Sequence, residues 1–117
     1  MDFFEHIELI QADFIKTRKL LSAIGNETRQ TIITVLMKAS CQGMRVGEIT
    51  AETHLSRPAV SHHMRILLDC GLVSLEKQGT KNFYMLQIGE EFRDLFSLFN
   101  HLAQFKVAKD AALLAAE

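Results

Sequence analysis

Apolar side chains recur at helical spacing through the first third of the chain. Residues 3–21 and residues 27–40 each show this spacing and predict an amphipathic helix. Gly25-Asn26 separates the two stretches, and Asn26 is a suitable N-cap for the second helix. The predicted apolar stripe is Phe3, Ile7, Ile10 and Phe14 in the first helix, and Ile32, Val35, Leu36 and Ala39 in the second. We expect the second helix to end near Ser40.

A fourth helix has one apolar face and one polar face. It follows a short third helix over residues 46–53, whose Val46 and Ile49 point to the core. Ser56 is suited to cap its start, and Gly71 to end it as a left-handed residue. At about 100° per residue, the apolar face consists of Val60, Met64, Leu67 and Leu68, and the opposite face of Pro58, Ser61, His62, Arg65 and Asp69.

After Gly71 the spacing changes from helical to alternating. Residues 72–77 and 83–87 predict two strands, joined by a loop longer than two residues that contains Gly79. A long final helix follows Gly89, with an apolar stripe made of Phe92, Leu95, Phe96, Phe99, Leu102 and Ala103. A helix-turn-helix followed by a hairpin is a winged helix. The expected fold class is therefore mainly α with a β-hairpin (α+β): a winged helix-turn-helix with helical extensions at both ends.

Composition excludes several classes of protein. The 117 residues are 48% hydrophobic and 23% charged, with one Pro and six Gly, which excludes disordered and low-complexity chains. No run approaches the roughly 18–20 apolar residues of a membrane span, and the acidic start does not resemble an export signal. We therefore expect a cytoplasmic protein with no membrane partner.

Phenylalanines gather at the two ends of the chain. Of eight Phe, seven lie within residues 3–14 and 92–105. Two helices of one chain could bury this surface against each other, but we favour a homodimer that buries it across a two-fold axis. The expected dimer interface is Phe3, Phe4, Ile7, Phe92, Phe96, Phe99 and Leu102. We thus expect a single domain over residues 1–117, with dimerisation helices at 1–22 and 90–117 around a helix-turn-helix and wing at 26–87.

Positive charge is concentrated in one segment, although the net charge is −1. Residues 54–85 carry four Arg or Lys against two acids, whereas residues 86–117 carry three against five. Arg and His on a helix face suit DNA bases and phosphates, and a helix N-terminus suits a phosphate. The expected DNA-binding residues are Ser56, Arg57, Pro58, Ser61, His62, Arg65, Lys77 and Lys81. His63, at the edge of the apolar face, is expected to be structural.

Three segments resemble the ArsR/SmtB-type winged-helix repressors. Residues 22–29 (SAIGNETR) are similar to that family's L-A-D-P-T-R opening. Residues 55–64 (LSRPAVSHHM) resemble its recognition helix, L-S-Q-x-x-V-S-x-H-L, and residues 67–73 (LLDCGLV) its L-x-x-A-G-L-V exit into the wing. The resemblance implies a homodimeric, sequence-specific transcriptional regulator, usually a repressor that an inducer releases from double-stranded operator DNA. For a two-fold dimer the operator is expected to be an inverted repeat.

The metal ligands of family sensors are missing from the matching positions. Where some relatives carry C-V-C-D-L, residues 45–49 read RVGEI, and where others carry D-x-H this chain has Asp94-Leu95-Phe96. We therefore expect no metal and no cofactor. Some relatives sense persulfide or peroxide with two thiols, so Cys41 and Cys70 stay a lesser possibility for redox sensing. We slightly favour a small molecule or partner protein between the Phe-rich terminal helices as the inducer.

The sequence does not predict an enzyme. It contains no Gly-rich phosphate loop, no G-x-S-x-G and no H-E-x-x-H. Ser61 and His62 are helix neighbours and do not face each other as a nucleophile and its base must. Two alternatives to an operator-binding repressor remain: a winged helix used for protein–protein contact, and a metal- or thiol-responsive repressor of the same family.

Overall fold

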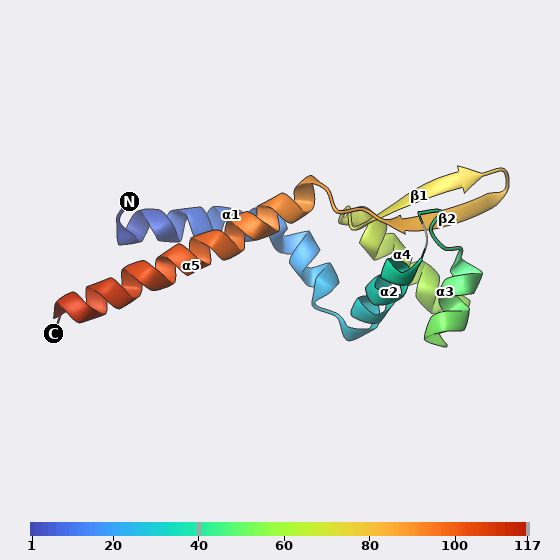
Figure 1. The fold of residues 1–117 in the computed structure, drawn as a ribbon, viewed down its shortest axis with the longest axis horizontal. Helices are drawn as coiled ribbons and strands as arrows, with labels where there is room; N and C mark the ends of the chain where they lie inside the picture. The colour runs from blue at the N-terminus through green and yellow to red at the C-terminus, as the bar shows by residue number, and fades with distance from the viewer. Residues whose placement is uncertain (40, 117) are drawn as a thin grey trace. The chain divides into compact units, whose positions relative to one another are not determined.

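Helices make up most of the structure, a computed structural model that describes residues 1–39 and 41–116 (Figure 1). The elements are α1 (Phe3–Ile24), α2 (Glu27–Lys38), α3 (Val46–Thr53), α4 (Arg57–Asp69), β1 (Val73–Gln78), β2 (Lys81–Leu86) and α5 (Glu90–Ala116). This order confirms the expected fold class. The described residues divide into a winged unit, residues 19–89, and a terminal unit, residues 1–18 with residues 90–116.

The ends of the first two helices differ slightly from the prediction. α1 continues to Ile24 instead of ending at residue 21, and α2 ends at Lys38. Ser40, near which we expected that end, lies outside the described residues. The predicted N-cap of α2 is confirmed, because Asn26 Oδ1 accepts a hydrogen bond from the backbone N–H of Arg29 at 3.0 Å.

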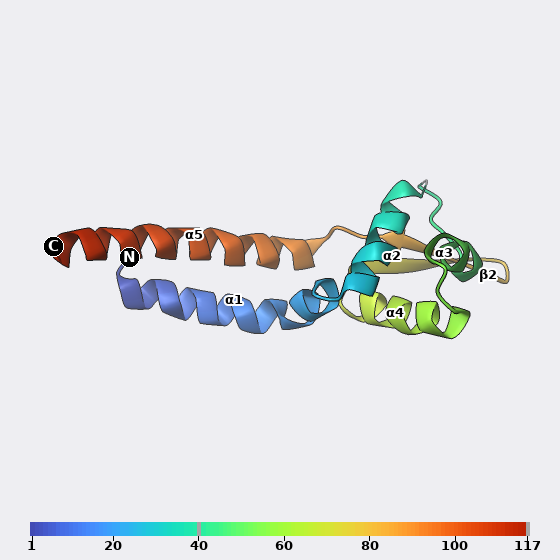
Figure 2. The same ribbon diagram turned by 90° about the horizontal axis from the view of Figure 1, so that it is seen from below.

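A single apolar core holds the winged unit together. Its buried apolar side chains are Leu20, Ala23, Ile32, Val35, Leu36, Ile49, Val60, Met64, Leu67, Cys70, Leu72 and Val73. Figure 2 shows α2, α3 and α4 beside the hairpin that closes this core. The predicted stripes of α2 and α4 are buried as expected, except that Ala39 and Leu68 are only half-buried.

Both ends of α4 are capped as predicted. At the start, Ser56 Oγ accepts from the backbone N–H of Ala59 at 3.2 Å. At the end, Gly71 has a φ of +83°, and the N–H groups of Gly71 and Leu72 donate to the carbonyls of Leu68 and Leu67 at 3.2 and 3.1 Å. This pair of bonds is a Schellman motif. The caps fix the length of α4 and the direction in which the chain leaves it for β1.

The hairpin is tighter than the sequence predicted. β1 and β2 pair antiparallel up to Gln78 and Lys81, so Gly79 and Thr80 alone form the turn. Gly79 has a φ of +66° at the first central position, as a type II′ turn requires. The prediction of a longer loop is wrong because Lys81 and Asn82 belong to the strand and pair through their backbone. The ribbon is exposed there on both faces, so polar side chains do not distinguish strand from loop.

A short bridge ties the hairpin to the segment before α3. Met44 and Tyr84 exchange two backbone hydrogen bonds, of 2.9 and 2.7 Å. Gly43 makes this approach possible, because its φ is +79° and a Cβ there would lie 2.5 Å from the Tyr84 carbonyl oxygen. The sequence analysis missed this bridge.

In the terminal unit, α1 and α5 run antiparallel and side by side in both views (Figures 1 and 2). The side chains that α1 buries in this unit are polar: His6, Asp13 and Thr17. The Asp13 carboxylate contacts Nδ1 of His101 on α5 and lies 3.5 Å from Ser97 Oγ. The predicted apolar stripe is not this buried line, since Phe3 and Phe14 are exposed and Ile7 and Ile10 half-buried. No helix in the described ranges is long and apolar enough to cross a membrane.

We predict that Gly43→Ala destabilises the protein more than Gly79→Ala. Both glycines have positive φ, which costs roughly 1–2 kcal/mol for a residue with a Cβ. Only at position 43 does the new Cβ also meet backbone, whereas nothing lies within 4 Å of a Cβ at position 79. Urea unfolding of the two variants measures the difference, and equal losses would contradict the role assigned to the Met44–Tyr84 bridge.

Candidate nucleic-acid interface

The polar face of α4 is presented to solvent. Ser61, His62 and Arg65 are exposed, while Val60, Met64 and Leu67 on the opposite side are fully buried. The structure thus brings the three predicted contact residues together on one face. The acid on this face, Asp69, lies 3.7 Å from Lys19 Nζ, which offsets its negative charge.

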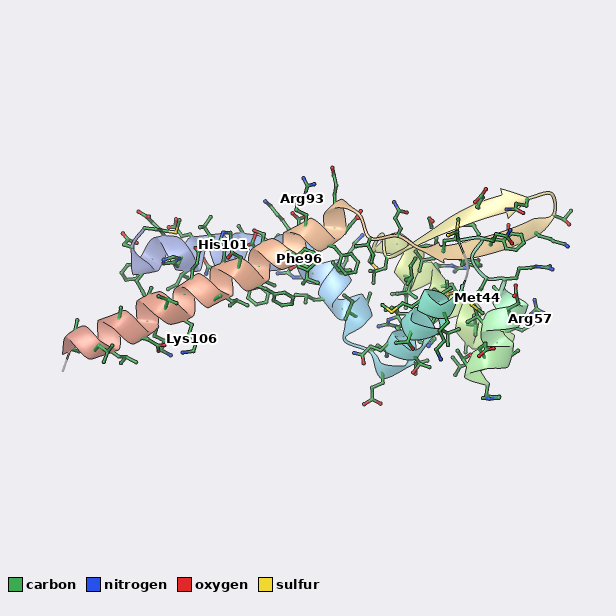
Figure 3. The ribbon with its side chains drawn as sticks, viewed as in Figure 1. Met44, Arg57, Arg93, Phe96, His101 and Lys106 are labelled. Atoms are coloured by element: carbon green, nitrogen blue, oxygen red, sulfur yellow. The ribbon has the colours of Figure 1, made fainter. Side chains whose placement is uncertain are left out.

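The start of α4 lies against the first turn of α3. Ser56, Arg57 and Pro58 are all exposed. A Cβ on Gly47 would lie 3.9–4.0 Å from the guanidinium nitrogens of Arg57, so this side chain turns toward α3. Figure 3 shows Arg57 on the side of the winged unit where these two helices lie. Ser56 Oγ accepts a hydrogen bond in the cap, and its O–H stays available to donate to a ligand.

The two hairpin lysines lie on opposite faces of the ribbon. Lys77 pairs with Asn82, and Gln78 with Lys81. Directly opposed residues share a face and neighbours along a strand alternate, so Lys77 and Asn82 lie on one face and Lys81 on the other. Both lysines are exposed, but the structure does not bring them together as one charged group.

Arg29 joins three helices of the winged unit. Its Nε donates to the Ala23 carbonyl at 2.9 Å and one terminal nitrogen to the Ser22 carbonyl at 3.2 Å, both at the end of α1. The other terminal nitrogen lies 3.3 Å from Nδ1 of His63 on α4. Arg29 therefore sets the position of α4 relative to the end of α1. Sequence analysis gave Arg29 no role, although it lies in the segment SAIGNETR that carries the family resemblance.

Burial and the contact with Arg29 both favour the neutral form of His63. A guanidinium can only donate, so Nδ1 of His63 accepts and the ring is neutral. Burial, followed by the positive charges of Arg29 and His62, lowers the pKa of His63 from its ordinary value of 6.5. His63 is half-buried between the core and the exposed face, as the expected structural role requires.

The two cysteines have different surroundings. Cys41 is exposed and Cys70 is buried, and both are free thiols. Cys70 Sγ lies 3.4 Å from the Leu67 carbonyl oxygen, and burial raises the pKa of the Cys70 thiol. A raised pKa lowers the thiolate fraction that redox chemistry needs. Among the described residues, no three His, Cys, Asp or Glu side chains gather as a metal site would require.

The predicted dimer residues are largely exposed in the single chain. Phe4, Phe96 and Phe99 have exposed fractions of 74%, 63% and 53%. Figure 3 shows Phe96 on α5. Phe3 is partly covered by Phe105, at a ring-centroid distance of 5.0 Å, while Ile7 and Phe92 are half-buried and Leu102 is exposed. The terminal unit therefore carries a large unpartnered apolar surface.

We predict that His63 makes the protein less stable in mild acid. Because the folded-state pKa lies below 6.5, the unfolded chain binds the proton more readily, and stability is lost as pH falls from 6.5 toward the folded value. His63→Gln keeps a neutral acceptor for Arg29 and removes this part of the decline. Unfolding free energies of both proteins between about pH 5 and 8 measure it. His62→Gln, one residue away, should retain most of the decline, because the His62 charge is the smallest of the three causes that lower the pKa of His63. A native-like decline in His63→Gln would refute the assignment.

Comparisons with known proteins agree with this geometry. The model of the bacterial regulatory protein, arsR family, matches residues 26–74. An uncharacterized HTH-type transcriptional regulator of Methanocaldococcus jannaschii is 32% identical over 87 residues, which cover 74% of this chain and 94% of that protein. An arsenical resistance operon repressor of Staphylococcus xylosus is 32% identical over 75 residues, 64% of this chain and 67% of the repressor.

A solved structure gives the same fold. An ArsR-like transcriptional regulator from Rhodococcus matches with a TM-score of 0.77 over 88% of this chain and 91% of its own, at 23% identity. Fold, family model and relatives agree with the resemblance in the α2–β1 region. The chain belongs to the arsR family of bacterial regulatory proteins, and is a DNA-binding transcriptional regulator and not an enzyme.

Proposed function

We propose that this protein is a homodimeric repressor that reads an inverted-repeat operator with the exposed face of α4. The observation that carries the proposal is the division of α4 into a fully buried apolar face and an exposed face with Ser61, His62 and Arg65. The second helix of a helix-turn-helix enters the major groove. An arginine there can pair with both acceptors of a guanine, and His62 and Ser61 can hydrogen-bond to base edges or phosphates.

Other groups of the winged unit hold the DNA backbone. Arg57 stands at the N-terminus of α4, where charge and helix dipole both favour a phosphate. Lys77 and Lys81 extend from the hairpin on its two faces. Only one face of the hairpin can face a given DNA strand. We therefore expect the two lysines to contribute unequally to the affinity for DNA.

The terminal unit provides the two-fold interface. Within one chain, α1 turns polar side chains toward α5, and Asp13 is satisfied there by His101 and Ser97. Phe4, Phe96 and Phe99 are left uncovered. Large exposed apolar side chains that gather on one part of a monomer mark an interaction surface, and a second copy of the chain can cover them. We therefore assign residues 1–22 and 90–117 to dimerisation and residues 26–87 to DNA binding, within a single domain.

The inducer is best sought at the terminal unit. Burial of Cys70 and its raised pKa weigh against a thiol pair as the sensor. The aromatic side chains of α1 and α5, which we assign to the dimer interface, also suit contact with an apolar small molecule or a partner protein that lodges between the terminal helices. An occupant there would change the spacing of the two recognition helices and so release the operator.

We predict that variants of α4 and of the hairpin weaken DNA binding in different ways. Against an operator selected from random duplexes, Arg65→Ala and His62→Ala should each cost about 1–3 kcal/mol, because they remove contacts to base edges. Lys81→Ala should weaken binding to all sequences alike and lower the salt slope by about one unit for each subunit of the dimer. Fluorescence anisotropy titrations over a range of salt measure both effects. Unchanged operator affinity in both α4 variants would favour a protein–protein module instead.

We predict that Phe99→Glu produces monomers. A carboxylate without a partner is not tolerated in a buried apolar interface. Met37→Glu is the matched control, since Met37 is 62% exposed on α2, outside the terminal unit. Sedimentation equilibrium should give a dimer for the native chain and for Met37→Glu, and a monomer for Phe99→Glu. A native chain that sediments as a monomer would exclude the proposed assembly.

A further inference from the structure

A polar hollow lies where α3, α4 and the hairpin turn come together. Its volume is about 460 Å³, and its lining residues are Arg45, Val46, Gly47, Glu48, Arg57, Thr80 and Asn82. All of them belong to the winged unit. Apart from Arg57, the sequence analysis assigned none of these residues to DNA binding. It considered Arg45 only as the residue that replaces a cysteine of the family's metal sensors.

Two guanidinium groups from different elements line this hollow. Arg57 reaches from the start of α4 to Gly47 in the first turn of α3, where a Cβ would lie 3.9–4.0 Å from its nitrogens. Arg45 is the N-cap residue of α3. Within residues 1–39 and 41–116, neither arginine forms an ion pair. Two unneutralised cations that share one hollow favour an anion between them.

The remaining lining groups also suit an anion. The N–H groups of Val46 and Gly47 lie in the first turn of α3, where the helix leaves them without internal partners and the helix dipole is positive. The hydroxyl of Thr80 and the amide of Asn82 add donors from the hairpin. Glu48 is the one acid in the lining, and its carboxylate accepts from the backbone N–H of Arg45 at 3.1 Å. It is therefore engaged with the helix start.

We propose that this hollow binds one backbone phosphate of the operator, held by Arg45 and Arg57 together. The inference rests on the proposed function, because the hollow adjoins the start of the helix assigned to the major groove. Arg57 belongs to both, so a phosphate in the hollow is next to the bases that Ser61 and Arg65 would reach.

Arg45→Gln tests the proposal with the full-length chain. The variant should bind the selected operator and a scrambled duplex more weakly by the same factor, about tenfold, because a phosphate contact is independent of sequence. Its slope of log affinity against log salt should fall by about 0.9 for each subunit, or about 1.8 for the dimer. Arg45→Lys, which keeps the charge, should retain the slope. Arg93→Gln on α5 is the matched control for loss of one exposed arginine, and should also retain it.

A scan of operators identifies the phosphate. Each operator carries neutral methylphosphonate linkages at one symmetry-related pair of positions. Neutralising one symmetry-related pair should weaken the native chain and Arg93→Gln strongly, and Arg45→Gln less, because in that variant Arg57 is the only arginine left to lose its contact. An unchanged salt slope in Arg45→Gln, or a scan that weakens this variant as much as the native chain at every linkage, would overturn the proposal. Thermal unfolding of each variant shows that the protein tested is folded.

Two further measurements answer separate questions. One asks whether the hollow binds a DNA phosphate or a free phosphate, and the other asks whether the proposed function itself holds. Inorganic phosphate should compete with DNA no better than chloride at equal ionic strength. Saturation by micromolar inorganic phosphate, with a silent methylphosphonate scan, would assign the hollow to a free phosphate compound and overturn the proposal. If the native chain does not prefer its operator over the scrambled duplex, the proposed function fails, while the salt slope on the scrambled duplex still tests the hollow.

Discussion

The rotation of α4 about its own axis is the constraint on which the interface depends. Val60, Met64 and Leu67 are fully buried, and burying three such side chains contributes roughly 5–9 kcal/mol. That is comparable with the whole stability of a small domain, about 5–15 kcal/mol. A turn of α4 by one residue would expose these side chains, so the core permits one orientation only. Ser61, His62 and Arg65 face outward because their neighbours must face inward, and Arg29 fixes the helix against the end of α1 through His63.

The terminal unit shows a different distribution of polarity. Its internal contact between α1 and α5 is polar at Asp13, His101 and Ser97, whereas much of its aromatic surface faces solvent. A contact with these polar groups and few apolar ones buries little apolar surface. Two helices joined in this way are not expected to be stable as an independent domain. In the proposed two-fold assembly, the same helices would bury this apolar surface against a second copy of the chain. The winged unit, by contrast, buries a core that runs from Leu20 to Val73 within one chain.

Local signals explain what the sequence could predict. The caps of α4 at Ser56 and Gly71 and its 3.6-residue apolar spacing depend only on near neighbours, and they predict the bounds and the buried face of α4 correctly. Contacts between distant segments were not predictable in this way. Met44 pairs with Tyr84 over a single bridge, too short for an alternating pattern. Arg29 meets His63 across 34 positions, and Asp13 meets His101 across 88. The hollow at Arg45 is formed by residues of α3, α4 and the hairpin, so no single sequence motif indicates it.

The central claim is that the exposed face of α4 reads bases, and the base preference of the Arg65→Ala variant tests it most directly. Selection from a pool of random duplexes gives the preferred base at each position for the native chain and for the variant. We predict an inverted repeat for the native chain. In Arg65→Ala the preference should be lost at one symmetry-related pair of positions, with the rest of the site retained. An identical base preference in both proteins, or no preference in the native chain, would contradict it.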